Sequence, residues 1–179
     1  MAGDERGNVR LNSLSELNDY CYVVAGIVGE MLTELFLHHQ PDLVCVGPGL
    51  MRVAPYFGEG LQLVNILKDS KSDVLDGRKF VPDGVPRTIL FERARRDLQH
   101  AEAYVRILKN NGAAVGLTRF TQLPVLLAKA ALNRIEESGP GSKISREDVA
   151  GIVAAVSQSR PLPSTGPTRV LLAEPRGFC

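Results

Sequence analysis

The sequence has few of the residues that build disulfide frameworks and zinc sites. Its three cysteines are Cys21, Cys45 and Cys179. No two of them have the CxxC spacing of a metal or redox motif, and the three histidines are not spaced to complete one. An odd cysteine count without such spacing excludes a disulfide-built fold, and a reducing cytoplasm is the expected compartment.

Long runs of one charge sign and long apolar runs are also missing. Lys and Arg number 21 against 20 Asp and Glu, a formal net charge of +1, so nothing indicates a nucleic-acid partner. The longest apolar run, 23–28, ends before Glu30 and Glu34 and is shorter than the about 20 residues of a membrane span. The polar first ten residues predict no signal peptide. One globular domain is therefore expected.

Periodicity, caps and breakers predict five helices and no strand. The expected helices are 14–37, 55–73, 88–109, 113–137 and 145–158. Ser13 with Glu16, and Ser145 with Asp148, have the spacing of helix-start signals. The bundle is expected to occupy 13–158, between a flexible N-terminus at 1–12 and a disordered tail at 159–179 that is rich in Pro, Ser, Thr and Gly. The predicted fold class is all-α.

Prolines and glycines set the expected boundaries. Residues 38–50 are predicted to be a connection because they contain two prolines and two glycines. Pro55 suits the first turn of the second helix, and Pro124 is expected to kink the fourth. Asn111-Gly112 is expected to end the third.

A polar stripe on the second expected helix carries the clearest chemical signal. Its members are Gln62, Asn65, Asp69 and Asp73. The spacings of three, four and four residues place them within roughly 80° of one helix face. Most of the remaining circumference is apolar, which indicates a buried helix with one face on a polar cavity.

Two aspartates four residues apart repel each other when both are ionised, and a divalent cation removes that repulsion. Their hard oxygens suit Mg²⁺, which takes one or two carboxylates plus phosphate oxygens and would neutralise a leaving diphosphate. Lys68 and Arg78 lie close enough in sequence to contact a diphosphate. The alternatives are a solvated acidic patch, and ordinary ion pairs from Lys68 and Arg78 to neighbouring aspartates.

Small residues mark the first expected helix. Gly26 and Gly29 each cost about 1 kcal/mol relative to alanine, so close approach of another helix or of a ligand chain must compensate. A buried Tyr20 would orient or accept a proton beside a carbocation, and its ring would stabilise positive charge. The alternative is close helix packing with Tyr20 as a core aromatic residue.

Together the two segments resemble the squalene/phytoene synthase family. The first matching run is Tyr20-Cys21-x-x-Val24-Ala25-Gly26-Ile27-Val28-Gly29-x-x-Leu32-x-x-Leu35. The second is Gly58-x-x-x-Gln62-x-x-Asn65-Ile66-x-Lys68-Asp69-x-x-x-Asp73-x-x-x-x-Arg78-x-Phe80-x-Pro82. The departures from the family pattern are Phe57, Lys68 and Ser70. The resemblance extends over roughly residues 14 to 156.

The resemblance implies an isoprenoid synthase-type helical bundle, here incomplete and formed by the C-terminal half. Such enzymes join two prenyl diphosphates head to head with Mg²⁺. By motif match, Asn65, Asp69 and Asp73 would bind the Mg²⁺–diphosphate cluster, the two aspartates as catalytic residues. Substrate would also be held by Gln62, Lys68 and Arg78. Tyr20 would assist the first condensation, and the tunnel for the hydrocarbon tails would be lined by Val24, Gly26 and Gly29.

Shorter matches favour a squalene-forming member that uses farnesyl diphosphate. Gly77-Arg78-Lys79-Phe80-Val81-Pro82 is more similar to the squalene type than to the phytoene type. The segment 120–124 is similar to one that serves the reductive second step, so Phe120 is a candidate substrate contact. Lys143-Ile144-Ser145-Arg146 resembles a segment that meets NADPH, with Ser145 in place of an arginine, so Lys143 is a candidate cofactor contact. The alternative is a phytoene synthase, which uses geranylgeranyl diphosphate in the carotenoid pathway.

The family's first DxxxD motif, which precedes the tyrosine segment, has no counterpart here. We therefore expect this polypeptide alone to be inactive and to expose a wide apolar face. Three interpretations stay open: part of a full enzyme, one half of a split enzyme whose N-terminal half is a second chain, and a non-catalytic helical interaction module. No C-terminal membrane anchor is expected, but the hydrophobic product implies peripheral contact with a membrane.

Overall fold

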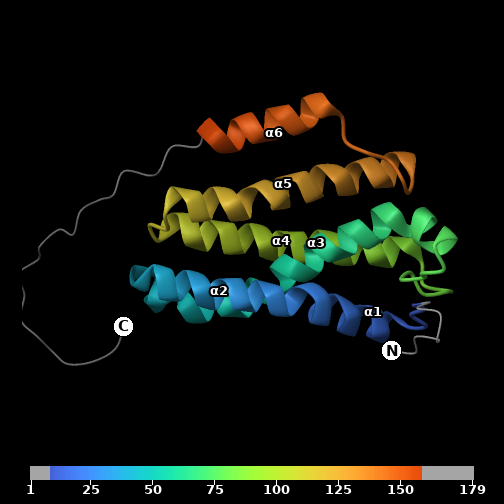
Figure 1. The fold of residues 1–179 in the computed structure, drawn as a ribbon, viewed down its shortest axis with the longest axis horizontal. Coiled ribbons are helices and arrows are strands. Elements are labelled where there is room, and N and C mark those ends of the chain that lie inside the picture. The colour runs from blue at the N-terminus through green and yellow to red at the C-terminus, as the bar shows by residue number, and fades with distance from the viewer. Residues whose placement is uncertain (1–8, 159–179) are drawn as a thin grey trace, which may run out of the picture.

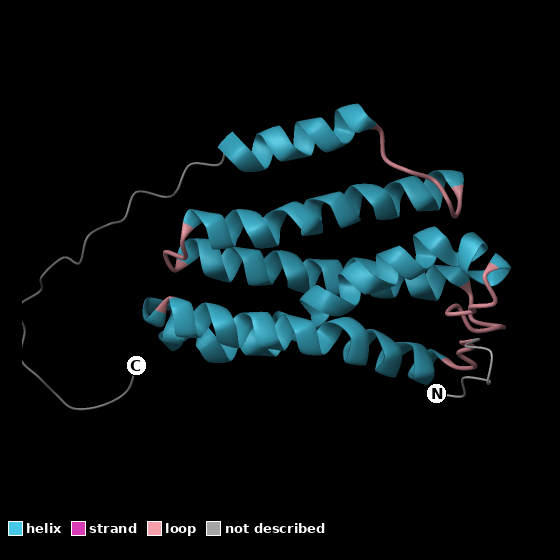
Figure 2. Cartoon of the chain, viewed as in Figure 1, coloured by secondary structure: helices cyan, strands magenta, loops and turns pink. Residues whose placement is uncertain are grey.

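The computed structural model describes residues 9–158 of the 179-residue chain, so the expected tail at 159–179 and residues 1–8 lie outside the described residues. Its elements are α1 (Leu14–Cys21), the π-helical turn η1 (Tyr22–Gly26), α2 (Ile27–His39), the 3₁₀ helix η2 (Pro41–Val46), α3 (Gly47–Leu75), α4 (Arg87–Asn110), α5 (Val115–Ser138) and α6 (Arg146–Gln158). Figure 2 shows this helical content. Within 9–158, β-type pairing is limited to an isolated parallel bridge between Arg10 and Lys79. The predicted all-α class is confirmed.

The first expected helix exists as a continuous helical stretch from 14 to 39, formed by α1, η1 and α2. Ser13 begins it as predicted, since its side-chain oxygen accepts a hydrogen bond from the Glu16 amide at 3.1 Å. The Glu16 carboxylate returns to the amide of Asn12 (3.0 Å), one residue earlier than in a capping box. The π-helical turn was not predicted.

The expected connection at 38–50 is wrong, because most of it is helical. Pro41 and Pro48 lie in the first turns of η2 and α3, where a missing amide proton costs no hydrogen bond. As a result α3 runs for 29 residues, and Pro55 lies inside it rather than in its first turn. Pro41 and Pro48, which the sequence pattern indicated as helix breakers, therefore lie at the starts of helices.

The last three helices lie within two residues of their expected bounds. Gly112 and Gly139 follow the ends of α4 and α5 with positive φ values of 74° and 85°, which glycine adopts at little cost. The capping box of α6 is confirmed: the Asp148 amide donates to Ser145 Oγ at 3.0 Å, and the Ser145 amide donates to the Asp148 carboxylate at 3.3 Å. α5 continues through Pro124.

The helices pack in successive layers around α3 and α4 (Figure 1). The stretch from α1 to α2 covers one side of this pair, α5 covers the other, and α6 lies on α5. Two buried clusters result. The first lies around the second half of α3 and contains Leu63, Leu67, Leu90, Leu98 and Leu132. The second lies around its first half and contains Phe36, Leu50, Phe57, Tyr104 and Leu108.

Glycines allow the first helical stretch to cross α3 in backbone contact. A Cβ added to Gly29 would lie 2.1 Å from the Ala54 carbonyl oxygen, and one added to Gly58 would lie 1.9 Å from that of Ala25. Neither position can hold a side chain without moving the helices apart. Close helix packing therefore accounts for Gly29.

Candidate functional site

The candidate site lies at the end of the bundle where α3 ends. The last turns of α3 carry Asp69 and Asp73, and the following loop, 76–86, carries Arg78. Residues 9–13, the beginning of α1 and the loop between α5 and α6 lie at the same end (Figure 1). Residues from three separate parts of the chain thus lie at the end of the bundle where the stripe ends.

The polar stripe has the amphipathic placement that its spacing predicts. Leu63, Val64, Ile66 and Leu67, which lie between its members, are all buried. Asn65 is exposed, and Gln62 is half-buried. The side chain of Asp69 is 47% exposed, whereas that of Asp73 is only 13% exposed. The two aspartates therefore differ in their access to solvent.

Both predicted basic residues form ion pairs with the stripe. Lys68 Nζ lies 3.3 Å from Asn65 Oδ1 and 3.4 Å from Asp69 Oδ2. Arg78 contacts Asp73 at 3.2 Å. These are the pairs named above as the alternative to diphosphate contacts. They also place one cation beside each aspartate. An anionic ligand that binds next to a carboxylate needs such a cation, because the two negative charges would otherwise repel each other.

The loop after α3 folds back over the helix end. The Arg78 amide donates to the Asp73 carbonyl oxygen at 2.7 Å, and the Asp76 amide donates to the same oxygen at 3.1 Å. Gly77, with φ of 76°, makes the turn possible. Arg78 is therefore held beside Asp73 by its backbone as well as by its side chain.

Tyr20 joins this group from α1. Its ring packs against Phe80 with centroids 4.9 Å apart and an interplanar angle of 33°. Burial raises the pKa of the Tyr20 phenol; the charges of Cys21 and Asp73 raise it further, while Arg78 opposes them. The phenol is therefore protonated at neutral pH and lies within the electrostatic reach of the stripe.

The structure places the remaining predicted residues in three surroundings. Lys143 is exposed in the loop 139–145, whose Gly141 amide donates to the Lys68 carbonyl oxygen at 2.8 Å, so this loop contacts the helix that carries the stripe. Phe120 lies near the start of α5, at the opposite end of the bundle, where its ring meets Phe36 edge-to-face. Gly26 is buried beneath Tyr22 and next to Glu59.

Val24 lies on an exposed apolar face of the first helical stretch. This face consists of Val23, Val24, Ile27, Val28, Met31 and Leu35, which are 38–57% exposed. The wide apolar surface predicted from the sequence is therefore present. The same helical stretch, 14–39, is long and apolar enough to cross a membrane by length and composition, which corrects the exclusion based on its short central run. One such helix is weak support for membrane association.

The oxygen donors of the stripe suit Mg²⁺ in type. Two carboxylates and one amide are hard ligands, and phosphate oxygens of a substrate would supply the rest. Among residues 9–158 no group of three or more His, Cys, Asp and Glu side chains converges as a preformed metal site. The donors of the stripe are of a suitable chemical type, and binding of Mg²⁺ there stays a prediction.

A buried charge network next to the stripe was missed by the sequence analysis. Arg93 on α4 contacts Glu59 at 2.7 Å, Asp97 at 2.8 Å and the Asn18 amide oxygen at 2.5 Å. Burial raises the pKa of both carboxyl groups, and it raises that of the neighbouring Cys21 thiol to about 12. One sequence feature could have indicated this network: Glu59 is the only charged residue in the run 57–61, whose other members are small or apolar.

Comparison with known proteins identifies relatives of the segment that carries the site. Residues 1–85 match the model of the squalene/phytoene synthase family. A probable squalene synthase of Neurospora crassa is 37% identical over 75 residues, which is 40% of this chain and 15% of that protein. A squalene synthase of Eremothecium gossypii is 36% identical over 83 residues, and one of Candida albicans is 38% identical over 80; each match covers 44% of this chain and 18% of the relative.

The chain thus spans less than a fifth of the length of the curated relatives it matches. The matched region contains α1 to α3 and most of the loop with Arg78 and Phe80, and the family match ends before α4. The family match covers just under half of the chain, and it supports membership of the squalene/phytoene synthase family through this segment.

Proposed function

We propose that this chain provides the second Mg²⁺–diphosphate site of a squalene synthase-like prenyltransferase, which joins two farnesyl diphosphates head to head. The observation that supports it best is the meeting of Tyr20, Asp73, Arg78 and Phe80 at the end of α3. An acid, a base, a cation and an aromatic ring from α1, α3 and the loop come together there.

In this proposal the residues form groups with different roles. Asn65, Asp69 and Asp73 would hold Mg²⁺, which when bound would neutralise the leaving diphosphate. Lys68 and Arg78 exchange their aspartate partners for phosphate oxygens, and the half-buried Gln62 adds a neutral hydrogen bond. The protonated Tyr20 hydroxyl would orient the leaving group, while the ring stabilises positive charge on the hydrocarbon.

The farnesyl substrate and the squalene product are supported by the names of the relatives, which are squalene synthases. NADPH is proposed as the reductant of the second step. The position of the loop with Lys143 supports this. Its Gly141 amide donates a hydrogen bond to the Lys68 carbonyl oxygen, so the loop lies next to the helix that carries the stripe. A product assay that includes the helices with the first DxxxD motif separates the alternatives: we expect squalene from farnesyl diphosphate with NADPH, whereas phytoene from geranylgeranyl diphosphate would favour the alternative.

The second part of the proposal is that this polypeptide does not act alone. The exposed apolar face on η1 and α2 needs a complementary apolar surface in water. We propose that helices carrying the first DxxxD motif, in the same protein or in a second chain, cover it. The hydrophobic product would keep the assembly at a membrane surface.

Calorimetric titration with inorganic pyrophosphate, with and without Mg²⁺, tests the site in this chain. We expect Mg²⁺-dependent binding that weakens at least tenfold in Asp69→Ala/Asp73→Ala. The matched control is Asp42→Ala/Glu137→Ala, which removes two exposed carboxylates outside the stripe and should bind normally. Equal binding by both double variants would contradict the proposal. Absence of Mg²⁺-dependent binding by the unaltered chain would favour a non-catalytic interaction module.

A further inference from the structure

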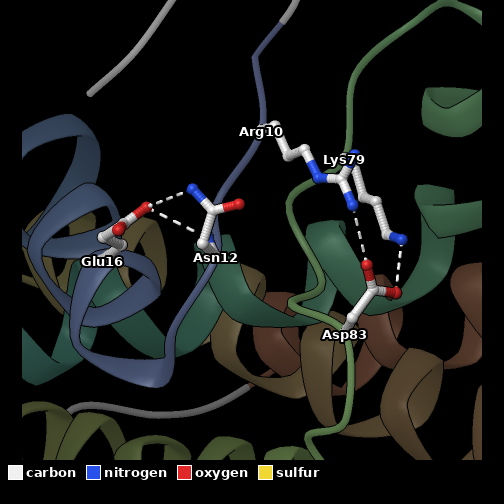
Figure 3. A network of polar contacts seen from close by, with 5 residues as sticks. All are labelled: Arg10, Asn12, Glu16, Lys79 and Asp83. Carbon is white, nitrogen blue, oxygen red and sulfur yellow. Dashed lines mark hydrogen bonds and ion pairs between the residues drawn. The ribbon is translucent and has the colours of Figure 1, made fainter.

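We infer that residues 9–12 form a clamp on the loop after α3, and that Arg10 is a positioning residue which holds Arg78 and Phe80 in place for diphosphate binding. The inference rests on the proposed function for its consequence, but not for its geometry. Figure 3 shows the polar side chains of the clamp: Arg10, Asn12, Glu16, Lys79 and Asp83.

The backbone part of the clamp fixes Lys79 from both sides. The Lys79 amide donates to the Val9 carbonyl oxygen at 2.7 Å, and the Leu11 amide donates to the Lys79 carbonyl oxygen at 2.9 Å. Leu11 is 1% exposed and belongs to the first buried cluster, against which Phe80 and Val81 pack. This anchored side chain ties the pairing to the core.

The side-chain part of the clamp centres on Asp83. Arg10 donates to one of its carboxylate oxygens at 2.9 Å, and Lys79 pairs with the other (Figure 3). All three side chains are at least a third exposed, so each ion pair alone is weak. Together they connect both ends of the segment 79–83 to residue 10, which hinders its separation from the N-terminal residues.

The clamp acts on the site through the residues on either side of Lys79. Arg78 and Phe80 are the two chain neighbours of Lys79, so fixing the Lys79 backbone restricts the positions that both side chains can take. Arg78 contacts Asp73, and Phe80 packs on Tyr20. Holding Lys79 therefore sets the direction of the proposed phosphate-binding cation and of the ring that supports the tyrosine.

The clamp also joins the loop to the helix of Tyr20. The Asn12 amide donates to the Glu16 carboxylate in the first turn of α1, one turn before Tyr20. Residues 9–12 thus bridge the two elements that carry the site, α1 and the loop. An internal link of this kind reduces the entropy lost when a ligand orders the site.

The first test measures positioning in the ligand-free chain by NMR. We expect Arg10→Ala to raise the exchange rate of the Lys79 amide, and to shift the ring resonances of Tyr20 and the Arg78 Nε–H signal. Arg10→Lys should restore most of these signals because it keeps the charge. Arg134→Ala is the matched control: it removes one exposed arginine on α5. Unchanged Tyr20 and Arg78 signals in Arg10→Ala would overturn the inference.

The second test measures affinity for Mg²⁺ with inorganic pyrophosphate. Arg10→Ala should weaken binding about three- to tenfold, with a melting temperature close to that of Arg134→Ala, and Arg10→Lys should bind nearly normally. Equal affinities for Arg10→Ala and Arg134→Ala would overturn the inference. Absence of pyrophosphate binding in the unaltered chain would instead overturn the proposed function, and the NMR test would still decide the clamp.

Discussion

The two halves of α3 use the same helix for different purposes. In the packing half, residues 54–60, Gly58 touches the first helical stretch, Gly60 touches α4, and Glu59 is buried in a charge network. In the polar half, residues 62–73, the acidic side chains reach the surface and pair with cations beside them. The comparison leads us to expect that charges in the packing half serve stability, whereas those in the polar half serve the proposed ligand site.

The largest effect expected in the packing half is that of Arg93→Ala. The substitution leaves Glu59 and Asp97 buried without their cation, which should lower the free energy of unfolding by about 3–5 kcal/mol. Urea unfolding followed by circular dichroism measures this change. Arg95→Ala on the same helix removes an exposed pair with Glu136, and it should cost no more than about 1 kcal/mol. Similar losses in both variants would show that the network does not stabilise the fold.

The next effect is that of Gly58→Ala at the helix crossing. The new methyl group would lie 1.9 Å from the Ala25 carbonyl oxygen, so the helices must separate, at a cost of about 2–3 kcal/mol. Gly151→Ala in α6 is the matched control, because no atom lies within 4 Å of its added Cβ. It should gain about 0.5–1 kcal/mol from helix propensity. Stabilisation by both substitutions in thermal unfolding would contradict the close crossing.

A smaller effect is expected in the pH dependence of stability. The folded-state pKa values of Glu59 and Asp97 are raised by burial, so the folded chain holds protons that the unfolded chain has released. Stability should therefore fall as pH rises from the ordinary carboxyl pKa, near 4, to the raised values. Melting temperatures from pH 4 to 7 measure the slope, which Glu59→Gln should flatten. An equal slope in the unaltered chain and in Glu59→Gln would show that Glu59 does not cause the pH dependence of stability.

The smallest effect on stability should come from the polar half. Asp69→Asn removes an exposed carboxylate and its repulsion from Asp73. The free energy of unfolding should therefore change by no more than about 0.5 kcal/mol. Pyrophosphate affinity in Mg²⁺ should nevertheless fall at least tenfold. A variant that loses stability but keeps its affinity would reverse the distinction between the two halves.

Helix positions and the stripe were predictable because their signals are local. The caps at Ser13 and Ser145 and the spacing of the four stripe residues depend on neighbours within a turn or two. The helical residues within 38–50 were missed because a proline in a first turn looks the same in sequence as a proline that ends a helix.

The contacts that assemble the site could not be predicted in the same way. Arg10 and Asp83 are 73 residues apart, and Arg93 and Asn18 are 75 apart. No periodicity links residues so distant. The family resemblance named Tyr20 and Arg78 as site residues, but only the packed helices show the ring of Phe80 beside one and the carboxylate of Asp73 beside the other.

The π-helical turn at Tyr22–Gly26 lies between α1, which carries Tyr20, and α2, where Gly29 packs against α3. The direction in which Tyr20 points therefore depends on this turn as well as on the packing at Gly29. Such a turn accommodates one more residue than an α-helical turn, and each residue rotates an α-helix by about 100°. Deleting one residue there would leave Gly29 against Ala54 but would turn α1, and with it the phenol, by more than a quarter of a revolution. The reach of the tyrosine towards Asp73 therefore depends on the length of a five-residue segment that contains neither residue.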